Sequence, residues 1–175
     1  MTARVLYDLA GADPALRFSP YCWRAKLALA HKGLDVETVP WRFFEKSRIE
    51  FSGQGKVPVL VDGERTVTDS WAIAEYLDSQ YPDRPALFAG EQARHIARFV
   101  NEWADRVLMT SIATLIITDI HDCLHADDQA YFRSTREKAF GAALEAVSAE
   151  RDKKVTAFRA LLTPLRGLLM HQAFI

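Results

Sequence analysis

The sequence predicts an α/β domain followed by an all-α domain. In the first half of the 175 residues, short apolar runs with strand character alternate with helix-patterned runs. A hairpin signal, Asp62-Gly63, separates two of the strands. Beyond residue 85, apolar residues recur at helical spacing without a convincing strand pattern. The predicted order is therefore βαβ-ββα and then helices, with domains at 1–84 and 85–175.

The first helix-patterned run covers residues 20–32. Ser19 is a preferred N-cap, Pro20 is favoured at the first helical position, and Gly33 provides a C-terminal stop. Three apolar residues share one face of this helix: Trp23, Leu27 and Ala30. Because a helix start presents unpaired N–H groups and a partial positive charge, it stabilises an anion such as a thiolate.

Strands flank this helix on both sides. The first covers residues 5–7, and the second covers residues 36–39 and is closed by Pro40. Because the connections are short, the βαβ order predicts that these two strands are parallel.

The hairpin and the helix after it complete the first domain. Its strands cover residues 57–61 and 65–68, and Pro58 is placed at the first residue of its strand, where a sheet tolerates proline. Asp69-Ser70 then open a helix, in which Ser70 can accept an unpaired N–H. The apolar residues on one face of that helix are Ile73, Tyr76 and Leu77.

Three helical runs are predicted in the second half. The first carries an apolar stripe from Ile96 through Val107 to Ile116, and the second runs from Tyr131 to Val147. The third runs from Phe158 to Leu169, and Pro164 is expected to kink or start it.

Composition excludes several classes of function. The 22 Lys and Arg nearly balance the 23 Asp and Glu, which gives no electrostatic case for binding nucleic acid or an anionic membrane. The longest apolar run, residues 108–120, is too short and polar to span a bilayer. Two cysteines make no disulfide framework, and nothing resembles a signal peptide, so we expect a cytoplasmic protein.

Four motifs carry a resemblance to a known family: Ser19-Pro20-Tyr21-Cys22-Trp23-Arg24, Lys56-Val57-Pro58-Val59-Leu60, the run from Asp69-Ser70-Trp71 to Leu77, and Tyr81-Pro82-Asp83-Arg84-Pro85. In a chain whose element order is that of a thioredoxin-like domain, they resemble the glutathione transferases. More narrowly, the chain is similar to the bacterial β-etherase-type enzymes and their fungal relatives in the Ser19–Arg24 helix start, His31-Lys32-Gly33, the Asp69-Ser70-Trp71 opening and the segment 131–137. The resemblance implies glutathione as co-substrate, no metal, a small hydrophobic electrophile, a role in detoxification and a homodimer.

The resemblance also implies roles for individual residues. Ser19 would be the catalytic hydroxyl that donates to the glutathione sulfur. The glutathione-binding residues would be Val57, whose backbone meets the cysteinyl part beside an expected cis Pro58, Asp69 and Ser70 at the γ-glutamyl end, and Lys56 at the glycyl carboxylate. Each has a plainer structural interpretation: a helix cap for Ser19, a trans proline at an edge strand, an ordinary cap for Asp69-Ser70, and a solvated lysine.

Two further groups are candidate sites. Cys22 lacks a partner cysteine at position 19, so dithiol chemistry is disfavoured; inert packing is expected, with thiol exchange through Cys22 alone as a minor alternative. His121 and His125 have the spacing of metal ligands, yet no further His or Cys cluster accompanies them and Cys123 points elsewhere. Ordinary helix-end polarity is the favoured interpretation there.

The resemblance fails at the end of the sequence. In such transferases a Gly-Gly-Asp-like turn and a capped central helix follow, and neither comes before Phe174-Ile175. We therefore expect an incomplete helical domain, with apolar faces over 89–123 and 154–171 left exposed unless a dimer covers them. Three hypotheses remain: a transferase acting on an aromatic electrophile or aryl ether, a non-catalytic protein that binds glutathione or apolar ligands, and an inactive fragment.

Overall fold

The computed structural model describes residues 4–173, so the chain end at Phe174-Ile175 lies outside the described residues. The chain divides into two compact units. The first holds the residues up to Arg94 together with Cys123–Tyr131, and the second holds His95–Asp122 and the residues from Phe132 on. The domain boundary between residues 84 and 85 stays a prediction.

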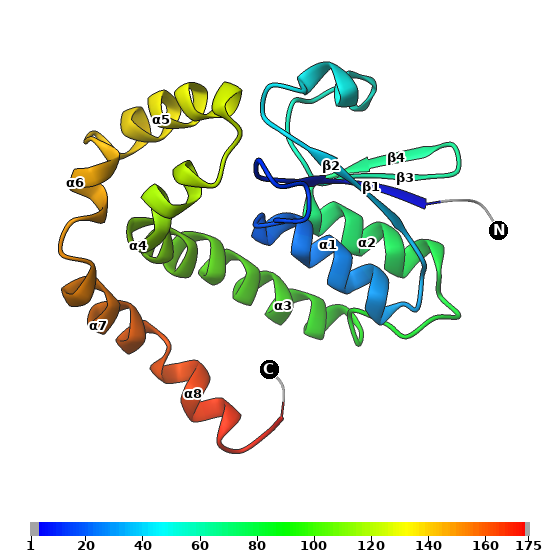
Figure 1. The fold of residues 1–175 in the computed structure, drawn as a ribbon. Helices are drawn as coiled ribbons and strands as arrows, with labels where there is room; N and C mark the ends of the chain where they lie inside the picture. Colours follow the sequence, from blue (N-terminus) through cyan, green and yellow to red (C-terminus); the bar gives the residue numbers. More distant parts are fainter. Residues whose placement is uncertain (1–3, 174–175) are drawn as a thin grey trace. The chain divides into compact units, whose positions relative to one another are not determined.

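A four-stranded sheet forms the centre of the first unit, with the strand order β2-β1-β3-β4 (Figure 1). The strands are β1 (Arg4–Leu9), β2 (Glu37–Trp41), β3 (Val59–Asp62) and β4 (Arg65–Thr68). β1 pairs with β2 in parallel, as the βαβ order predicts, and with β3 antiparallel. β3 and β4 form the predicted hairpin.

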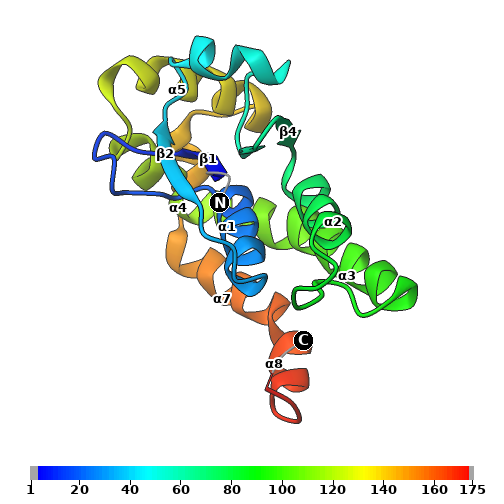
Figure 2. The same ribbon diagram turned by 90° about the vertical axis from the view of Figure 1, so that its right-hand side faces the viewer.

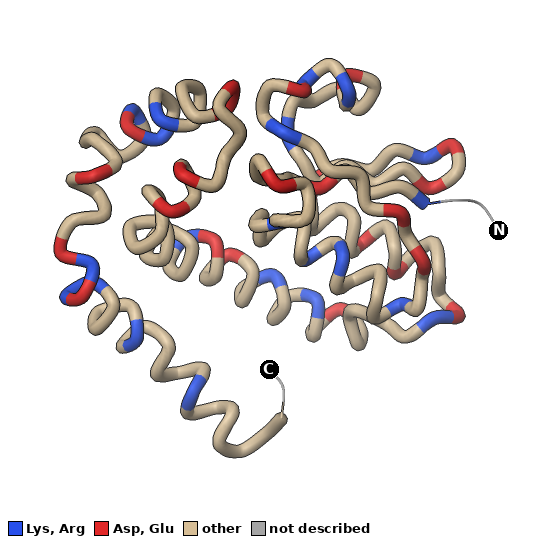
Figure 3. The backbone as a smooth tube through the Cα atoms, in the orientation of Figure 1, with Lys and Arg blue, Asp and Glu red and all other residues tan. Residues whose placement is uncertain are grey.

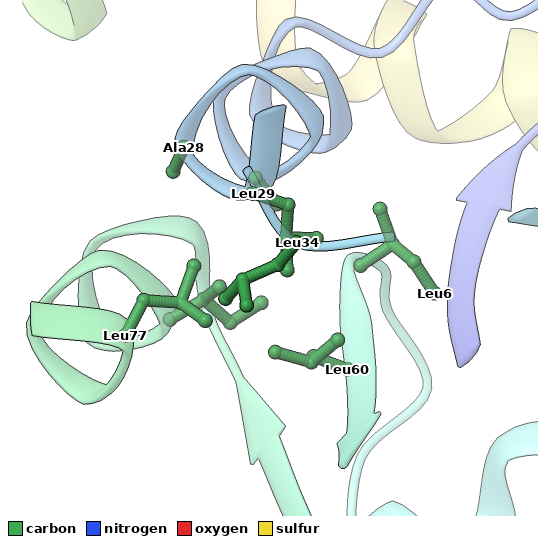
Figure 4. Packing of buried hydrophobic residues seen from close by; sticks show 8 residues of the cluster. Leu6, Ala28, Leu29, Leu34, Leu60 and Leu77 are labelled. Carbon is green, nitrogen blue, oxygen red and sulfur yellow. The ribbon is translucent and has the colours of Figure 1, made fainter. Parts of the chain in front are cut away.

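Helices α1 (Pro20–His31) and α2 (Ser70–Gln80) lie side by side on the same side of the sheet (Figures 1 and 2). Their apolar side chains meet those of β1 and β3 in one cluster, and the side chains labelled in Figure 4 converge there: Leu6, Ala28, Leu29, Leu34, Leu60 and Leu77. A second cluster contains Leu9, Trp41 and Val59 with Ile49 of the 3-10 helix η1 (Lys46–Ser52). Apolar side chains therefore pack on both faces of the central strands.

The predicted face of α1 is not the face that packs. Trp23 and Leu27 are 46% and 62% exposed, and the buried side chains are those of Cys22, Ala25, Ala28 and Leu29. Trp23 has reasons to stay at the surface, because its Nε1–H donates to the Arg17 carbonyl at 2.9 Å and its ring lies under the Lys26 ammonium. On α2, by contrast, Ile73 and Leu77 are fully buried and Tyr76 packs against them, as predicted.

Two prolines lie differently from the prediction. Pro40 does not close the second strand, which continues to Trp41; β2 is an edge strand, where a missing N–H is tolerated. Pro58 precedes β3 instead of beginning it, and the Val57-Pro58 peptide bond is cis, as expected.

The second unit is helical, as predicted, but its helices are shorter and more numerous. The elements in this half of the chain, of which α3 and α5 extend into the first unit, are α3 (Glu91–Trp103), the π-helical segment η2 (Ala104–Leu108), α4 (Met109–Asp122), α5 (Ala126–Phe140), α6 (Leu144–Ser148), α7 (Arg151–Leu161) and α8 (Thr163–Leu169). Gly141, at φ 69°, separates α5 from α6, where one helix was predicted. Pro164 lies in the first turn of α8, so it starts a helix.

Burial in the helical half is sparse. The described helices α3, α7 and α8 contain no buried residue, and Ile96 and Phe99 on the predicted stripe are 66% and 72% exposed. Basic and acidic residues are interspersed along both units (Figure 3). In the described part of the chain, no helix combines the length and apolar character needed to cross a membrane.

Candidate functional site

The start of α1 places Ser19 as the sequence predicts. Ser19 is the N-cap, is nearly buried, and its Oγ accepts the Cys22 N–H at 3.3 Å. This bond uses a lone pair of the hydroxyl oxygen and leaves the hydroxyl proton for another acceptor. A donor at a helix N-terminus, where the partial charge is positive, is suited to stabilise an anion such as a thiolate.

The sheet register brings the other predicted residues to the same end of the sheet. Val59 pairs with Tyr7 on one side and with Thr68 on the other. Continuing both antiparallel ladders by one residue places Pro58 opposite Asp8 and Asp69. The end of β1, the Val57-Pro58 backbone and the start of α2 therefore meet at one edge. Cys22 belongs to the same apolar cluster as Val57, which brings the first turn of α1 there as well.

Asp69, and not Ser70, caps α2. The Asp69 carboxylate accepts the backbone N–H groups of Trp71 and Ala72 at 2.9 and 3.0 Å. Its φ of 73° is uncommon for a residue other than glycine, and such backbone strain is concentrated at functional sites. Ser70 is the first residue of the helix and is nearly buried. Among the described residues its hydroxyl has no hydrogen-bond partner, so it stays available to a ligand.

Lys56 is exposed and has no ion-pair partner in the described part of the chain. It follows the Gly53–Gly55 stretch, which lines a surface hollow together with Lys46, Ser47 and Glu50. A second hollow is lined by residues of α2 and the start of α3, including Glu75, Asp78 and Arg94. Ser19 lines neither hollow.

Cys22 is fully buried, as expected for a packing residue. Burial raises the pKa of its thiol to about 12, against opposing contributions from the Ser19 side chain and the Leu9 backbone; the Asp8 carboxylate raises it further. Near neutral pH the thiol is therefore protonated and is a poor nucleophile. Over the described residues no group of three or more His, Cys, Asp or Glu could hold a metal ion. His121 instead contacts Asp122 at 3.0 Å.

Two buried carboxylates were missed by sequence analysis. Asp8 of β1 is fully buried and meets Arg17 and Lys26. Asp128 of α5 is also fully buried, and it accepts the backbone N–H groups of Phe43 and Phe44 at 3.2 and 2.8 Å. The alternation of side-chain directions along β1 could have indicated that Asp8 is buried, because Asp8 lies on the same strand face as the buried Leu6. Asp128 gave no such signal, since its partners lie 84 and 85 residues away.

Comparison with protein families agrees with this geometry. Residues 14–85 match the model of the glutathione S-transferase N-terminal domain, and residues 96–174 match that of the C-terminal domain. The chain belongs to the glutathione transferase superfamily. The thioredoxin-like sheet followed by helices, which the sequence predicted, is the fold of this superfamily.

Two curated relatives from plants match about half of the chain. The zeta class glutathione S-transferase of Euphorbia esula is 37% identical over 98 residues, which are 53% of this chain and 42% of that protein. Glutathione S-transferase Z2 of Arabidopsis thaliana is 37% identical over 94 residues, 51% of this chain and 40% of that protein. The chain thus spans less than half the length of these relatives.

Solved structures of fungal glutathione transferases match almost the whole chain. One from Phanerochaete chrysosporium has a TM-score of 0.84 at 28% identity and covers 97% of this chain and 73% of that one. One from Ceriporiopsis subvermispora, solved in complex with glutathione, has a TM-score of 0.83 at 26% identity and covers 95% and 73%.

Proposed function

We propose that this chain binds glutathione and catalyses attack of its thiolate on a hydrophobic, aromatic electrophile. The observation that carries the proposal is the convergence of three groups at one end of the sheet. These are the Ser19 hydroxyl at the start of α1, the Val57-Pro58 backbone before β3, and Asp69-Ser70 at the start of α2. Both helix starts favour negative charge, which suits a thiolate at one and a carboxylate at the other.

In the proposed reaction, glutathione loses its thiol proton to solvent, and the Ser19 O–H donates to the resulting thiolate. The sulfur forms a bond to an electrophilic carbon of the substrate. The leaving group departs with the bonding electron pair and takes a proton from water. If the substrate is an aryl ether, the leaving group is the aryloxide, which keeps the ether oxygen. Holding the thiolate in place and favouring its ionised form supply the rate enhancement.

The remaining glutathione contacts in this proposal are those that the family resemblance implies. Val57 would pair through its backbone with the cysteinyl part, Asp69 and Ser70 would hold the γ-glutamyl end, and Lys56 would meet the glycyl carboxylate. The free Ser70 hydroxyl and the exposed Lys56 ammonium support these assignments. Cys22, protonated and buried, is proposed to pack and not to react.

Aryl-ether cleavage, a cytoplasmic location and a homodimer are finer proposals. The Ser19–Arg24 and Asp69–Trp71 motifs support the first. Balanced charge and the absence of a membrane-crossing helix among the described residues are compatible with the second. Exposed apolar side chains on α3 and α8 would be covered in the third.

Glutathione binding without turnover is a second candidate. It is favoured by the described helices α7 and α8, which bury no side chain and so offer little rigid apolar wall for an electrophile. Saturable glutathione binding without conjugation of any aromatic electrophile would select this candidate.

Replacing the proposed catalytic hydroxyl tests the transferase proposal. We expect Ser19→Ala to lower kcat/KM with an activated aromatic halide at least about tenfold, because the thiolate loses its donor. Ser19→Thr keeps a hydroxyl and should retain most of the activity. Ser79→Ala, at an exposed hydroxyl of α2, is the matched control. An unchanged rate in folded Ser19→Ala would remove Ser19 from the mechanism.

A further inference from the structure

Asp8 is a buried charge that the proposed reaction does not use. It lies in β1, its side chain is completely inaccessible, and both cations beside it approach the same oxygen, Oδ2. Arg17 Nη1 is 3.2 Å from that oxygen and Lys26 Nζ is 2.9 Å from it. The other oxygen, Oδ1, has no hydrogen-bond partner in the described part of the chain.

A buried ion pair of this kind is weak evidence of a stabilising role. Removing carboxylates and cations from water costs several kcal/mol per ion, and apolar replacements are often neutral or stabilising. An oxygen left without a donor makes the arrangement less favourable still. The ion pairs of Asp8 with Arg17 and Lys26 therefore need an explanation other than stability.

The contacts of the two cations supply that reason. Arg17 precedes Ser19 by two residues; its Nε donates to the Pro14 carbonyl at 2.5 Å, and its own carbonyl accepts the Trp23 Nε1–H. Lys26 lies one turn beyond Cys22, with its ammonium 3.5 Å from the centre of the Trp23 ring. One side chain on the sheet thus fixes the chain on both sides of the Ser19 cap.

Asp8 also lies at the end of the sheet where the candidate site forms. Register extension places it opposite Pro58, and its carboxylate acts on the pKa of the Cys22 thiol, so it lies behind the first turn of α1. The loop from Ala10 to Arg17 is closed by a bridge between these two residues and by the Gly11 N–H bond to the Leu16 carbonyl at 3.0 Å. Arg17 therefore joins this loop, the sheet and the helix start.

We propose that Asp8 is a positioning residue: through Arg17 and Lys26 it holds the Ser19 hydroxyl in the orientation that donates to the glutathione sulfur. This inference rests on the proposed function. It assigns Asp8 no contact with substrate and no transfer of a proton.

The test compares two buried carboxylates of the same sheet. Asp62 ends β3, is 8% exposed, and pairs with Arg4 at 3.3 Å and with the Tyr76 and Tyr81 hydroxyls. Because β1 and β3 are antiparallel and Asp62 pairs with Arg4, it lies at the opposite end of the sheet from Ser19. Asp62→Asn removes a buried charge as Asp8→Asn does, without touching the Ser19 turn.

Two measurements distinguish a positioning role of Asp8 from a role in stability and from a direct effect of its charge. For Asp8→Asn we expect kcat to fall at least about tenfold and the pKa of the enzyme-bound glutathione thiol, followed by its ultraviolet thiolate absorbance, to rise by about one pH unit or more. Loss of a negative charge alone would move that pKa downward. Asp62→Asn should leave both readouts at wild-type values.

A second variant covers the case in which Asp8→Asn does not fold. Arg17→Lys keeps the positive charge beside Asp8 but loses the Nε donor to the Pro14 carbonyl, so it should reproduce the fall in kcat and the rise in the thiol pKa without a change of charge. The inference is overturned if the folded variants match wild type, or if Asp8→Asn lowers the thiol pKa. Wild-type protein that binds no glutathione would overturn the proposed function, and this inference with it; active wild type with unaffected variants overturns this inference alone.

Discussion

The first unit is packed on both sides of its sheet, whereas the helical unit leaves much of its apolar surface in contact with water. Leu6, Leu29 and Leu60 are completely buried in the first unit, and a second cluster surrounds Trp41. In the second unit, Leu144 is completely buried, yet Phe99 is 72% exposed. The candidate glutathione site thus lies in the unit whose core is closed, and its geometry should not depend on how the helices of the other unit are covered.

Hydrogen exchange should show this difference most strongly. Local opening costs range from near zero to the full unfolding free energy, and elements with few buried contacts lie at the low end. We expect amides of α7 and α8 to exchange at least about 100-fold faster than those of β1, β3 and α1. Equal protection in both sets would show that the helical unit is closed by contacts absent from this structure.

Core substitution gives the next largest effect. Leu60→Ala removes a fully buried side chain between α1, α2 and the sheet, and should lower the free energy of unfolding by about 2–5 kcal/mol in denaturant titrations. Phe99→Ala in α3 is the comparison, and should change it by less than about 0.5 kcal/mol. A large loss from Phe99→Ala would mean that α3 is covered in solution.

Breaking an ion pair in each unit should change the free energy of unfolding by a smaller amount. Asp78 accepts the backbone N–H groups of Leu87 and Phe88 and pairs with the buried Lys32 at 2.5 Å. Burial alone would raise the pKa of Asp78, but these donors lower it overall. Asp78→Asn should therefore cost about 1.5–3 kcal/mol at neutral pH.

The pH dependence of that loss has a defined sign. A depressed carboxyl pKa contributes stability above the unfolded-state pKa of about 3.9, and this is lost as the pH falls toward the folded-state pKa. The difference between wild type and Asp78→Asn should therefore shrink below about pH 4. In the second unit, Glu145→Gln breaks an exposed pair with Arg133 and should leave the unfolding midpoint unchanged. A stability difference between wild type and Asp78→Asn that persists below about pH 4 would contradict this assignment.

The order of the four strands and of helices α1 and α2 in the first unit could be predicted because its signals are local. The N-cap at Ser19, the stop at Gly33 and the Asp62-Gly63 turn each depend on a few neighbouring residues, and all three fix element boundaries. The prediction that Ser70 caps α2 was wrong by one residue. Asp and Ser are both good N-caps, and the backbone conformation makes Asp69 the cap.

Errors arose where tertiary contacts decide. Trp23 and Leu27 have the spacing of a core face, yet α1 packs on the sheet through the small residues Ala25 and Ala28. The spacing of large apolar residues does not show that a helix approaches a sheet through its small residues. The Asp8 cluster and the Asp128 contacts join segments distant in the chain, so no local pattern contains them. In the helical half, by contrast, the exposure of Ile96 and Phe99 agrees with the expectation of an uncovered apolar face over residues 89–123.

Calorimetric titration of glutathione into the intact chain tests the central claim most directly, with Ser70→Ala and the control Ser79→Ala measured alongside. The account predicts saturable binding in the micromolar to millimolar range that is lost in Ser70→Ala and kept in Ser79→Ala. No heat from a folded, monodisperse sample, or binding that Ser70→Ala leaves unchanged, would contradict it.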